Sequence, residues 1–336
     1  MEKGLRERNC AIDIAKFLAA VLVIAIHTRP LKDISCDADF FLCDIICRMA
    51  VPFFAICTGF YSTMKWEFAD GRLGKSKANF SLFARTIRKL IKIYLFWSFI
   101  YLGLWTYSWM DKGLQIDYHY YVGWLYALVV DTSYYHLWYL TSIGYAFVWF
   151  YLLLRYVRFK YLPIIAMALW IIEIAEYAYR TFLPCGIQEG LRYFDYLGSI
   201  SISFTRMLPL LLAGAIIARC GEIKRIHLST CILFILLLTE TYLLRQNGVI
   251  KFSFVFFTLP LSFYLFALIY RLGSKASCKS NELADISLFV YCIHPILIYA
   301  ISDKLFVQNR LMVFVLAAIS SVALGLLYQT WKTTRK

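Results

Sequence analysis

The sequence predicts an all-α polytopic membrane protein with about ten transmembrane helices. Apolar residues make up 61% of the 336-residue chain and charged residues only 17%, whereas an ordinary soluble domain is roughly 45–50% apolar. The apolar residues lie in long runs, and a membrane barrel would instead show short alternating strands. These two observations nearly exclude a water-soluble globular enzyme.

The net charge is strongly positive. Lys and Arg total 35 and Asp and Glu total 21, which gives a formal charge of +14, and 18% of the residues are aromatic. We expect no nucleic-acid partner, because no basic soluble helix and no zinc or RNA-binding motif accompanies the charge. The cations and aromatic residues instead suit the edges of a lipid bilayer.

Ten segments are apolar over roughly the 20 residues that a spanning helix needs. They are residues 10–29, 40–64, 86–109, 136–156, 162–180, 200–219, 227–244, 250–271, 286–302 and 309–331. We interpret residues 1–336 as a single transmembrane domain, because no repeat and no linker rich in Pro, Gly or Ser divides the chain. The aromatic-rich connection 110–135 is expected to hold a helix or loop along the interface.

Lys and Arg gather in every second connection, which is the pattern of the cytoplasmic side of a membrane protein. The connection between spans two and three is the richest. Its cations are Lys65, Arg72, Lys75, Lys77, Arg85, Arg88, Lys89 and Lys92. The pattern predicts a multi-pass protein of the cell membrane with both termini in the cytoplasm.

Ionisable residues inside spans are the main functional candidates, because an unpaired charge there costs at least about 2.5 kcal/mol. Asp13 and Lys16 lie three residues apart and are expected to pair near the cytoplasmic edge. Lys16 and His27 lie eleven residues apart, about 16 Å along the helix axis and on nearly the same face. They can therefore line one pathway without touching.

Three histidines, His27, His136 and His294, fall at similar depth toward the outer side. An imidazole titrates near neutral pH, so such a residue facing a cavity can act as a general base toward a hydroxyl. It can equally be a neutral histidine hydrogen-bonded between helices, or one hydrated at the interface. Three histidines could also hold a metal, but no carboxylate stands at ligand spacing, and we expect no metal.

Two further groups of charges are ambiguous from the residues alone. Arg85 and Arg88 share a helix face with Lys89 and Lys92, where guanidinium groups could hold phosphates or anchor the chain against anionic lipids. The second group could form structural ion pairs or line a route through the protein. It comprises Glu173, Glu176, Arg206 and Glu240.

Five sequence blocks carry a resemblance to a known family. They are IDIAKFLAAVLVIAIH (12–27), RMAVPFFAICTGFYS (48–62), ARTIRKLIKIY (84–94), HLWYL (136–140) and SLFVYCIHP (287–295). In this order they resemble successive signatures of the acyltransferase 3 family of integral membrane proteins. Within that family the first two blocks are most similar to the membrane half of vancomycin-resistance-type serine racemases, and we expect the soluble racemase domain to be absent.

The resemblance implies ten spans and transfer of an acyl group, often acetyl from cytoplasmic acetyl-CoA, to a hydroxyl of a cell-envelope glycan or related molecule. The family's pattern of a basic residue, ten residues and a histidine falls on Lys16 and His27. Its RxxR motif falls on Arg85 and Arg88. The family usually has Arg at the position of Lys16. Lys keeps the positive charge but lacks the planar guanidinium group that binds an anion through two N–H groups.

The leading hypothesis is therefore an integral membrane O-acyltransferase with His27 and Lys16 as catalytic candidates. Arg85 and Arg88 would bind the acyl-CoA donor, and His27 would deprotonate the acceptor hydroxyl or relay the acyl group. The substrate pathway would be lined by His136, Trp138, Arg206 and His294.

Two alternatives remain open. The chain could be a membrane subunit or carrier that supplies L-serine to a separate cytoplasmic serine racemase, in which case the embedded charges would line an amino-acid path. It could also be a noncatalytic membrane anchor or sensor, but this alternative explains the embedded charges less well.

Overall fold

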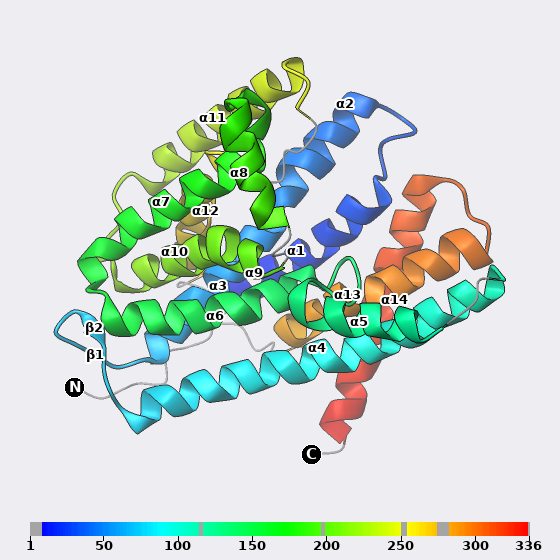
Figure 1. The fold of residues 1–336 in the computed structure, drawn as a ribbon, viewed down its shortest axis with the longest axis horizontal. Helices are drawn as coiled ribbons and strands as arrows, with labels where there is room; N and C mark the ends of the chain where they lie inside the picture. The colour runs from blue at the N-terminus through cyan, green and yellow to red at the C-terminus, as the bar shows by residue number, and fades with distance from the viewer. Residues whose placement is uncertain (1–8, 114–116, 196–198, 250–253, 274–281, 335–336) are drawn as a thin grey trace. The chain divides into compact units, whose positions relative to one another are not determined.

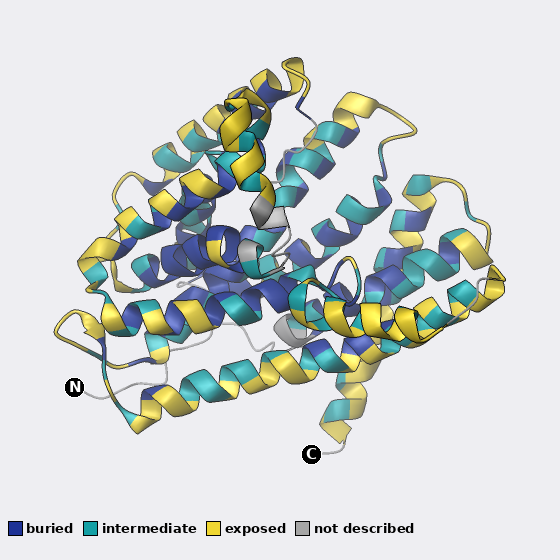
Figure 2. Cartoon of the chain, viewed as in Figure 1, coloured by how far each residue is buried: buried dark blue, intermediate teal, exposed yellow. Residues whose placement is uncertain are grey.

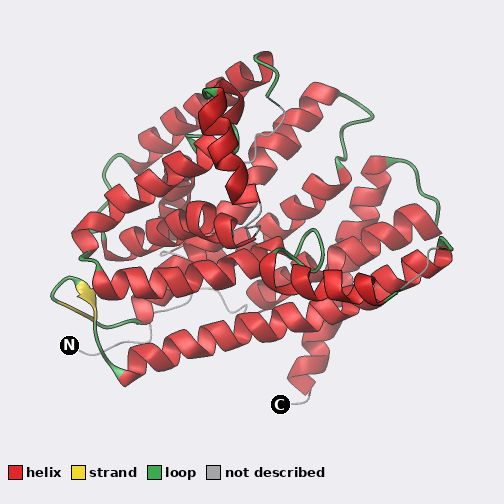
Figure 3. Cartoon of the chain, viewed as in Figure 1, coloured by secondary structure: helices red, strands yellow, loops and turns green. Residues whose placement is uncertain are grey.

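The computed structural model describes residues 9–113, 117–195, 199–249, 254–273 and 282–334 (Figure 1). Helices make up most of these ranges (Figure 3). Within them the only strands are β1 (Phe68–Ala69) and β2 (Arg72–Leu73), which pair antiparallel in one short hairpin. The all-α prediction is confirmed.

The chain divides into two compact units. The first combines residues up to Phe54 with those from Glu222 onward, and the second runs from Ala55 to Gly221. The helices of the first unit are α1 (Cys10–Thr28), α2 (Cys36–Asp39), the start of α3 (Ala50–Lys65), α11 (Ile226–Gln246), α12 (Thr258–Gly273), α13 (Glu282–Tyr299) and α14 (Arg310–Thr334). Those of the second are the rest of α3, α4 (Lys77–Asp111), α5 (Tyr118–Val130), α6 (Trp138–Tyr156), α7 (Leu162–Glu176), α8 (Cys185–Asp195), α9 (Ser199–Ile202) and α10 (Leu208–Arg219).

Six helical segments in the described ranges are long and apolar enough to cross a membrane. They are Cys10–Thr28, Cys36–Lys65, Lys77–Asp111, Ile226–Gln246, Ile286–Lys304 and Arg310–Thr334. Large apolar side chains remain exposed along them, such as Ile235 on α11 and Ile319 and Leu327 on α14. Figure 2 shows exposed positions along many of the helices. Helices of this kind, with apolar faces left uncovered by protein, belong in lipid. The protein is therefore a multi-pass membrane protein.

Helix α4 begins well before the predicted span 86–109, at Lys77. The Ser76 side chain caps it by accepting a hydrogen bond from the backbone N–H of Asn79, an N-terminal signal that hydropathy does not detect. At 35 residues the helix is about 52 Å long, which exceeds the roughly 30 Å hydrocarbon core of a bilayer. Its basic N-terminal part therefore extends beyond the apolar layer.

Helix α12 begins at Thr258, later than the predicted span 250–271, whose residues 250–253 lie outside the described ranges. The buried Glu240 of α11 explains the delay. Its two carboxylate oxygens accept hydrogen bonds from the backbone N–H groups of Phe256 (2.6 Å) and Phe257 (2.9 Å), which holds this segment as a turn. Both Glu240 carboxylate oxygens therefore bind backbone N–H groups.

Helices α1, α13 and α14 pack together in the first unit. Their shared core consists of small and branched apolar residues, which allows close approach of helices that gain little from hydrophobicity inside lipid. It comprises Ala20, Ile24, Ile286, Val290, Ile301, Val313 and Ala317. This packing brings the end of α1 against α13, where the candidate site lies.

In the second unit α3 and α10 approach through their backbones at Gly59 and Gly214. A Cβ atom on Gly214 would overlap the backbone of Ile56 and Phe60, and one on Gly59 would overlap the backbone of Leu211. Small residues permit such close helix crossings in membranes.

We predict that Gly214→Ala destabilises the protein by about 1–3 kcal/mol, the usual cost of overpacking. The measurement is the apparent melting temperature in detergent. Gly103→Ala on α4 is the matched control, because nothing lies within 4 Å of a Cβ there. Equal melting temperatures for the two variants would contradict the close crossing.

Candidate functional site

The structure brings together two of the predicted histidines, His27 of α1 and His294 of α13. Their ring centroids lie 5.2 Å apart with 30° between the ring planes. His27 is half-buried, and His294 is completely buried at 0% exposure. The two rings therefore meet at a site built by residues from opposite ends of the chain.

Pro295 determines how the His294 ring is held. A proline inside a helix has no N–H to donate to the carbonyl four residues earlier, which here is the carbonyl of Tyr291. The His294 Nδ1 atom lies 2.7 Å from that oxygen. Because a carbonyl only accepts, Nδ1 carries the hydrogen, and in the neutral ring Nε2 carries the lone pair. The His-Pro dipeptide is the sequence signal for this arrangement.

We predict that Pro295→Ala keeps the protein folded but lowers its activity. The new backbone N–H would compete with His294 for the Tyr291 carbonyl and would release the imidazole from one tautomer. The loss should be smaller than the about 100-fold or greater loss expected on removing a general base. Turnover and melting temperature should be measured beside Pro163→Ala, which alters a proline in the first turn of α7, where no helical hydrogen bond depends on it.

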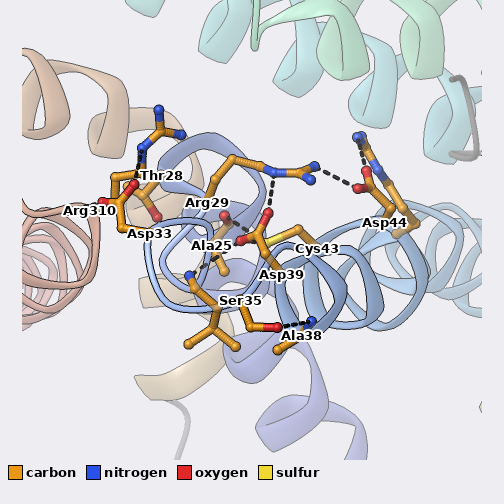
Figure 4. A network of polar contacts seen from close by, with 12 residues as sticks. Ala25, Thr28, Arg29, Asp33, Ser35, Ala38, Asp39, Cys43, Asp44 and Arg310 are labelled. Atoms are coloured by element: carbon orange, nitrogen blue, oxygen red, sulfur yellow. Dashed lines mark hydrogen bonds and ion pairs between the residues drawn. The ribbon is translucent and has the colours of Figure 1, made fainter.

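A charged network follows His27 at the end of α1. Arg29 adopts a left-handed conformation (φ 52°) and ends the helix. Its Nε lies 2.6 Å from the Asp39 carboxylate and one terminal nitrogen 2.7 Å from that of Asp44. Figure 4 shows the Arg29 guanidinium reaching both carboxylates.

The backbone between Asp39 and Asp44 explains why one guanidinium can reach both. Residues five apart on an α-helix point about 140° away from each other. Here the segment Phe40–Ile46 is a π-helix, whose wider turn brings positions five apart onto one face. Sequence analysis missed this network, because the π-helix is not visible in hydropathy.

Arg48 joins the network and extends it toward His27. Its guanidinium lies 3.3 Å from Asp44 and is close enough to His27 to act on it electrostatically. Its Nε is buried and has no hydrogen-bond partner within the described part of the chain. Arg48 therefore offers a buried N–H donor within electrostatic range of His27.

Lys16 lies three turns before His27 on α1. Its ammonium is 3.6 Å from the Asp13 carboxylate, so the predicted pairing of these residues is confirmed. The Lys16 side chain is 21% exposed, whereas that of Asp13 is almost buried. Lys16 can thus still meet a ligand from its open side.

The remaining site candidates lie in the second unit. The Arg206 side chain forms hydrogen-bonded ion-pair contacts of 2.5–2.6 Å with Glu173 of α7, whose other carboxylate oxygen accepts from the Thr205 hydroxyl at 2.6 Å. The rings of Trp138 and Tyr177 lie 5.5 and 4.8 Å from the guanidinium carbon. From the sequence, Arg206 and Glu173 could form a structural ion pair or line a route through the protein. The structure shows the ion pair. Trp138 joins Arg206, and its part in a substrate path stays a prediction.

His136 is buried directly before α6. Its ring packs edge-on against Tyr101 at 4.6 Å and lies 5.6 Å from the ring of Tyr134. It belongs to the second unit, whereas His27 and His294 belong to the first. Across the described ranges no group of three or more His, Cys, Asp or Glu side chains is arranged to hold a metal ion.

Arg85 and Arg88 lie on one exposed face of α4 with Lys89 and Lys92, as predicted. Four guanidinium and ammonium groups that point away from the helix packing can meet phosphates or lipid headgroups.

Comparison with known proteins identifies the family of the chain. The acyltransferase domain family known as acyltransferase 3 matches residues 9–329. The chain is 27% identical over 329 residues to a serine/alanine racemase of Enterococcus gallinarum, covering 94% of this chain and 45% of that protein. It is 25% identical over 342 residues to an amino-acid racemase of Enterococcus faecalis, covering 96% and 46%.

The chain thus spans a little under half the length of these curated relatives. No solved structure matches it. The family match extends from the N-cap of α1 to the last turns of α14 and so includes both histidines of the pair and the basic face of α4. The chain belongs to the acyltransferase 3 family of integral membrane proteins.

Proposed function

We propose that this protein is an O-acyltransferase that moves an acyl group, acetyl in the simplest case, from a cytoplasmic CoA thioester to a hydroxyl of a cell-envelope acceptor. The observation that carries the proposal is the contact between His27 and His294 in a chain of the acyltransferase 3 family. The proposal includes ten spans, both termini in the cytoplasm and a location in the cell membrane, with the basic connections on the donor side.

His27 is the general base of this proposal. It takes the proton of the acceptor hydroxyl as the oxygen attacks the thioester carbonyl carbon. The C–S bond then breaks, and the departing CoA thiolate takes the proton from His27, so that the ester and free CoA are the products. His294 is a positioning residue in this step. Its Nε2 lone pair can accept a hydrogen bond from the His27 ring, and this bond would orient the His27 imidazole.

Arg48 has a separate role in the same step. Negative charge develops on the thioester oxygen in the transition state, and a fixed donor beside it lowers the barrier most. The Arg48 Nε–H is a buried donor without a described partner, within electrostatic range of His27. Asp44 and Arg29 hold Arg48 in place through the π-helical turn.

The test uses sealed vesicles that contain the protein with its cytoplasmic face accessible. They are incubated with radiolabelled acetyl-CoA and a cell-envelope extract, beside vesicles without the protein. We expect protein-dependent transfer of label to an envelope component. Label that stays entirely with CoA and water under these conditions would count against acyl transfer.

A second candidate function rests on the named relatives, which are racemases. In this reading the chain carries L-serine across the membrane to a cytoplasmic serine racemase, and embedded polar residues line the path. The same vesicles, given labelled L-serine and no CoA, decide between the two. Protein-dependent serine accumulation without acyl transfer would favour the carrier.

A further inference from the structure

A cavity of about 670 Å³ lies in the second unit where the start of α4 faces the end of α6. The described residues that line it include three cations, Lys75, Lys77 and Arg155, and no acidic residue. None of these cations forms an ion pair with a described carboxylate. A site of this size, with unneutralised cations, suits an anionic ligand of several charges.

The wall that carries Lys75 and Lys77 is held rigidly by Asn79, which is completely buried. Its amide nitrogen donates to the carbonyls of Glu67 and Gly74, each at 2.9 Å, and its oxygen accepts from the N–H of Glu67 at 3.0 Å. The hairpin turn is also tied to the chain after α6, because the N–H of Phe159 donates to the Gly71 carbonyl at 2.6 Å. These hydrogen bonds therefore fix the backbone that carries Lys75 and Lys77.

The opposite wall offers aromatic surface. Tyr151 is buried and fixed by Phe83, whose ring stacks on it at 4.3 Å. Tyr156 on this wall and Phe80 on α4 also line the cavity and remain 65% and 58% exposed. Exposed rings beside cations favour a ligand with both a flat base and phosphates, because a base can stack on an aromatic face.

The cavity continues into the basic face of α4. Lys77, Ser81, Arg85, Arg88 and Lys92 follow one another at intervals of three or four residues and so share one face of the helix. The stripe is about 22 Å long, and its far end enters the apolar part of α4. A ligand whose charged end lies in the cavity can therefore extend along the basic face of α4.

We propose that the cavity binds the nucleotide end of the acyl-CoA donor, that is, an adenine base with its 3′-phosphate. Lys75, Lys77 and Arg155 hold the phosphate, Tyr156 or Phe80 stacks on the base, and the diphosphate reaches Arg85 and Arg88. This inference rests on the proposed function, since it names the donor subsite of the same transfer. It assigns donor recognition to residues outside the RxxR motif.

The experiment measures binding and needs no turnover. Purified protein in nanodiscs of phosphatidylcholine is titrated with radiolabelled CoA and with adenosine 3′,5′-bisphosphate. We expect Lys75→Ala/Arg155→Ala to weaken binding of both ligands at least 10-fold and Tyr156→Ala to weaken it less. Arg158→Ala is the matched control, because Arg158 is an exposed cation close to Arg155 that does not line the cavity, and it should bind like the wild type.

The outcomes separate the two proposals. If the wild type binds CoA and the double variant binds it equally well, this subsite is wrong while the acyltransferase proposal stands. If the wild type binds no CoA, the donor itself is wrong, and both proposals fail. If anionic phosphatidylglycerol in the nanodisc displaces adenosine 3′,5′-bisphosphate from the wild type, the cavity is a lipid headgroup site, and the nucleotide assignment is overturned.

Discussion

Replacing His27 by alanine is expected to reduce acyl transfer by about 100-fold or more while the protein still folds and inserts. General acid–base catalysis typically contributes about 10²–10⁴-fold to a rate, and in the proposal His27 is the group that takes the proton of the acceptor hydroxyl. We assign His294 to orienting His27 and not to the acceptor, because its ring is completely buried whereas that of His27 is only half-buried. The measurement is label transfer from acetyl-CoA in vesicles at equal protein content.

His227→Ala supplies the control. His227 is exposed near the start of α11, and we expect its removal to leave transfer unchanged. Binding of CoA should survive in His27→Ala, because the base meets the acceptor and not the nucleotide. Full transfer by His27→Ala would remove His27 from the mechanism.

Glu173→Ala is expected to be the most destabilising substitution among the embedded charges. It would leave the Arg206 guanidinium buried at 8% exposure without its carboxylate. Breaking a buried pair by removing one partner typically costs about 3–5 kcal/mol. The apparent melting temperature in detergent should therefore fall sharply.

The double variant Glu173→Leu/Arg206→Met tests whether the unpaired Arg206 charge causes the loss of stability in Glu173→Ala. Well-packed apolar replacements for a buried pair are often neutral or stabilising, so we expect this variant to regain most of the lost stability. Glu222→Ala is the matched control, because its pair with Arg271 is long (4.0 Å) and exposed and should contribute less than about 1 kcal/mol. A double variant as unstable as Glu173→Ala would show that the charge pair is not the reason.

The stable double variant also bears on the substrate path. If it folds but transfers no label, Arg206 acts on substrate as the sequence suggested, in addition to pairing with Glu173. We expect it to retain transfer, because both Arg206 and Glu173 already satisfy each other and the Thr205 hydroxyl.

Much of the fold could be predicted from the sequence. The apolar runs predicted the helical class, and six helical segments in the described ranges are long and apolar enough to cross a membrane. The spacing of Asp13 and Lys16 predicted their ion pair correctly. Helix ends were less predictable, because they depend on caps. Ser76 starts α4 early through a side-chain hydrogen bond, and Glu240 delays α12 by binding two backbone N–H groups.

The site was predictable in part. His27 and His294 were each singled out as embedded histidines, but only the packing of α1 on α13 shows that their rings touch. The role of Pro295 follows from local backbone chemistry and could have been inferred from the dipeptide. The link from Arg29 to Asp39 and Asp44 could not, because it requires a π-helical turn.

The sequence by itself determined the membrane class, the helical content and the residues that carry charge into the spans. These properties depend on local composition and periodicity, which act along the chain without reference to distant segments. Only the tertiary structure decided which of those charges and histidines meet. Inside lipid the apolar faces of different helices are nearly equivalent, so partners are selected by close packing at small residues such as Gly59 and Gly214 and by polar contacts such as that of Glu173 with Arg206.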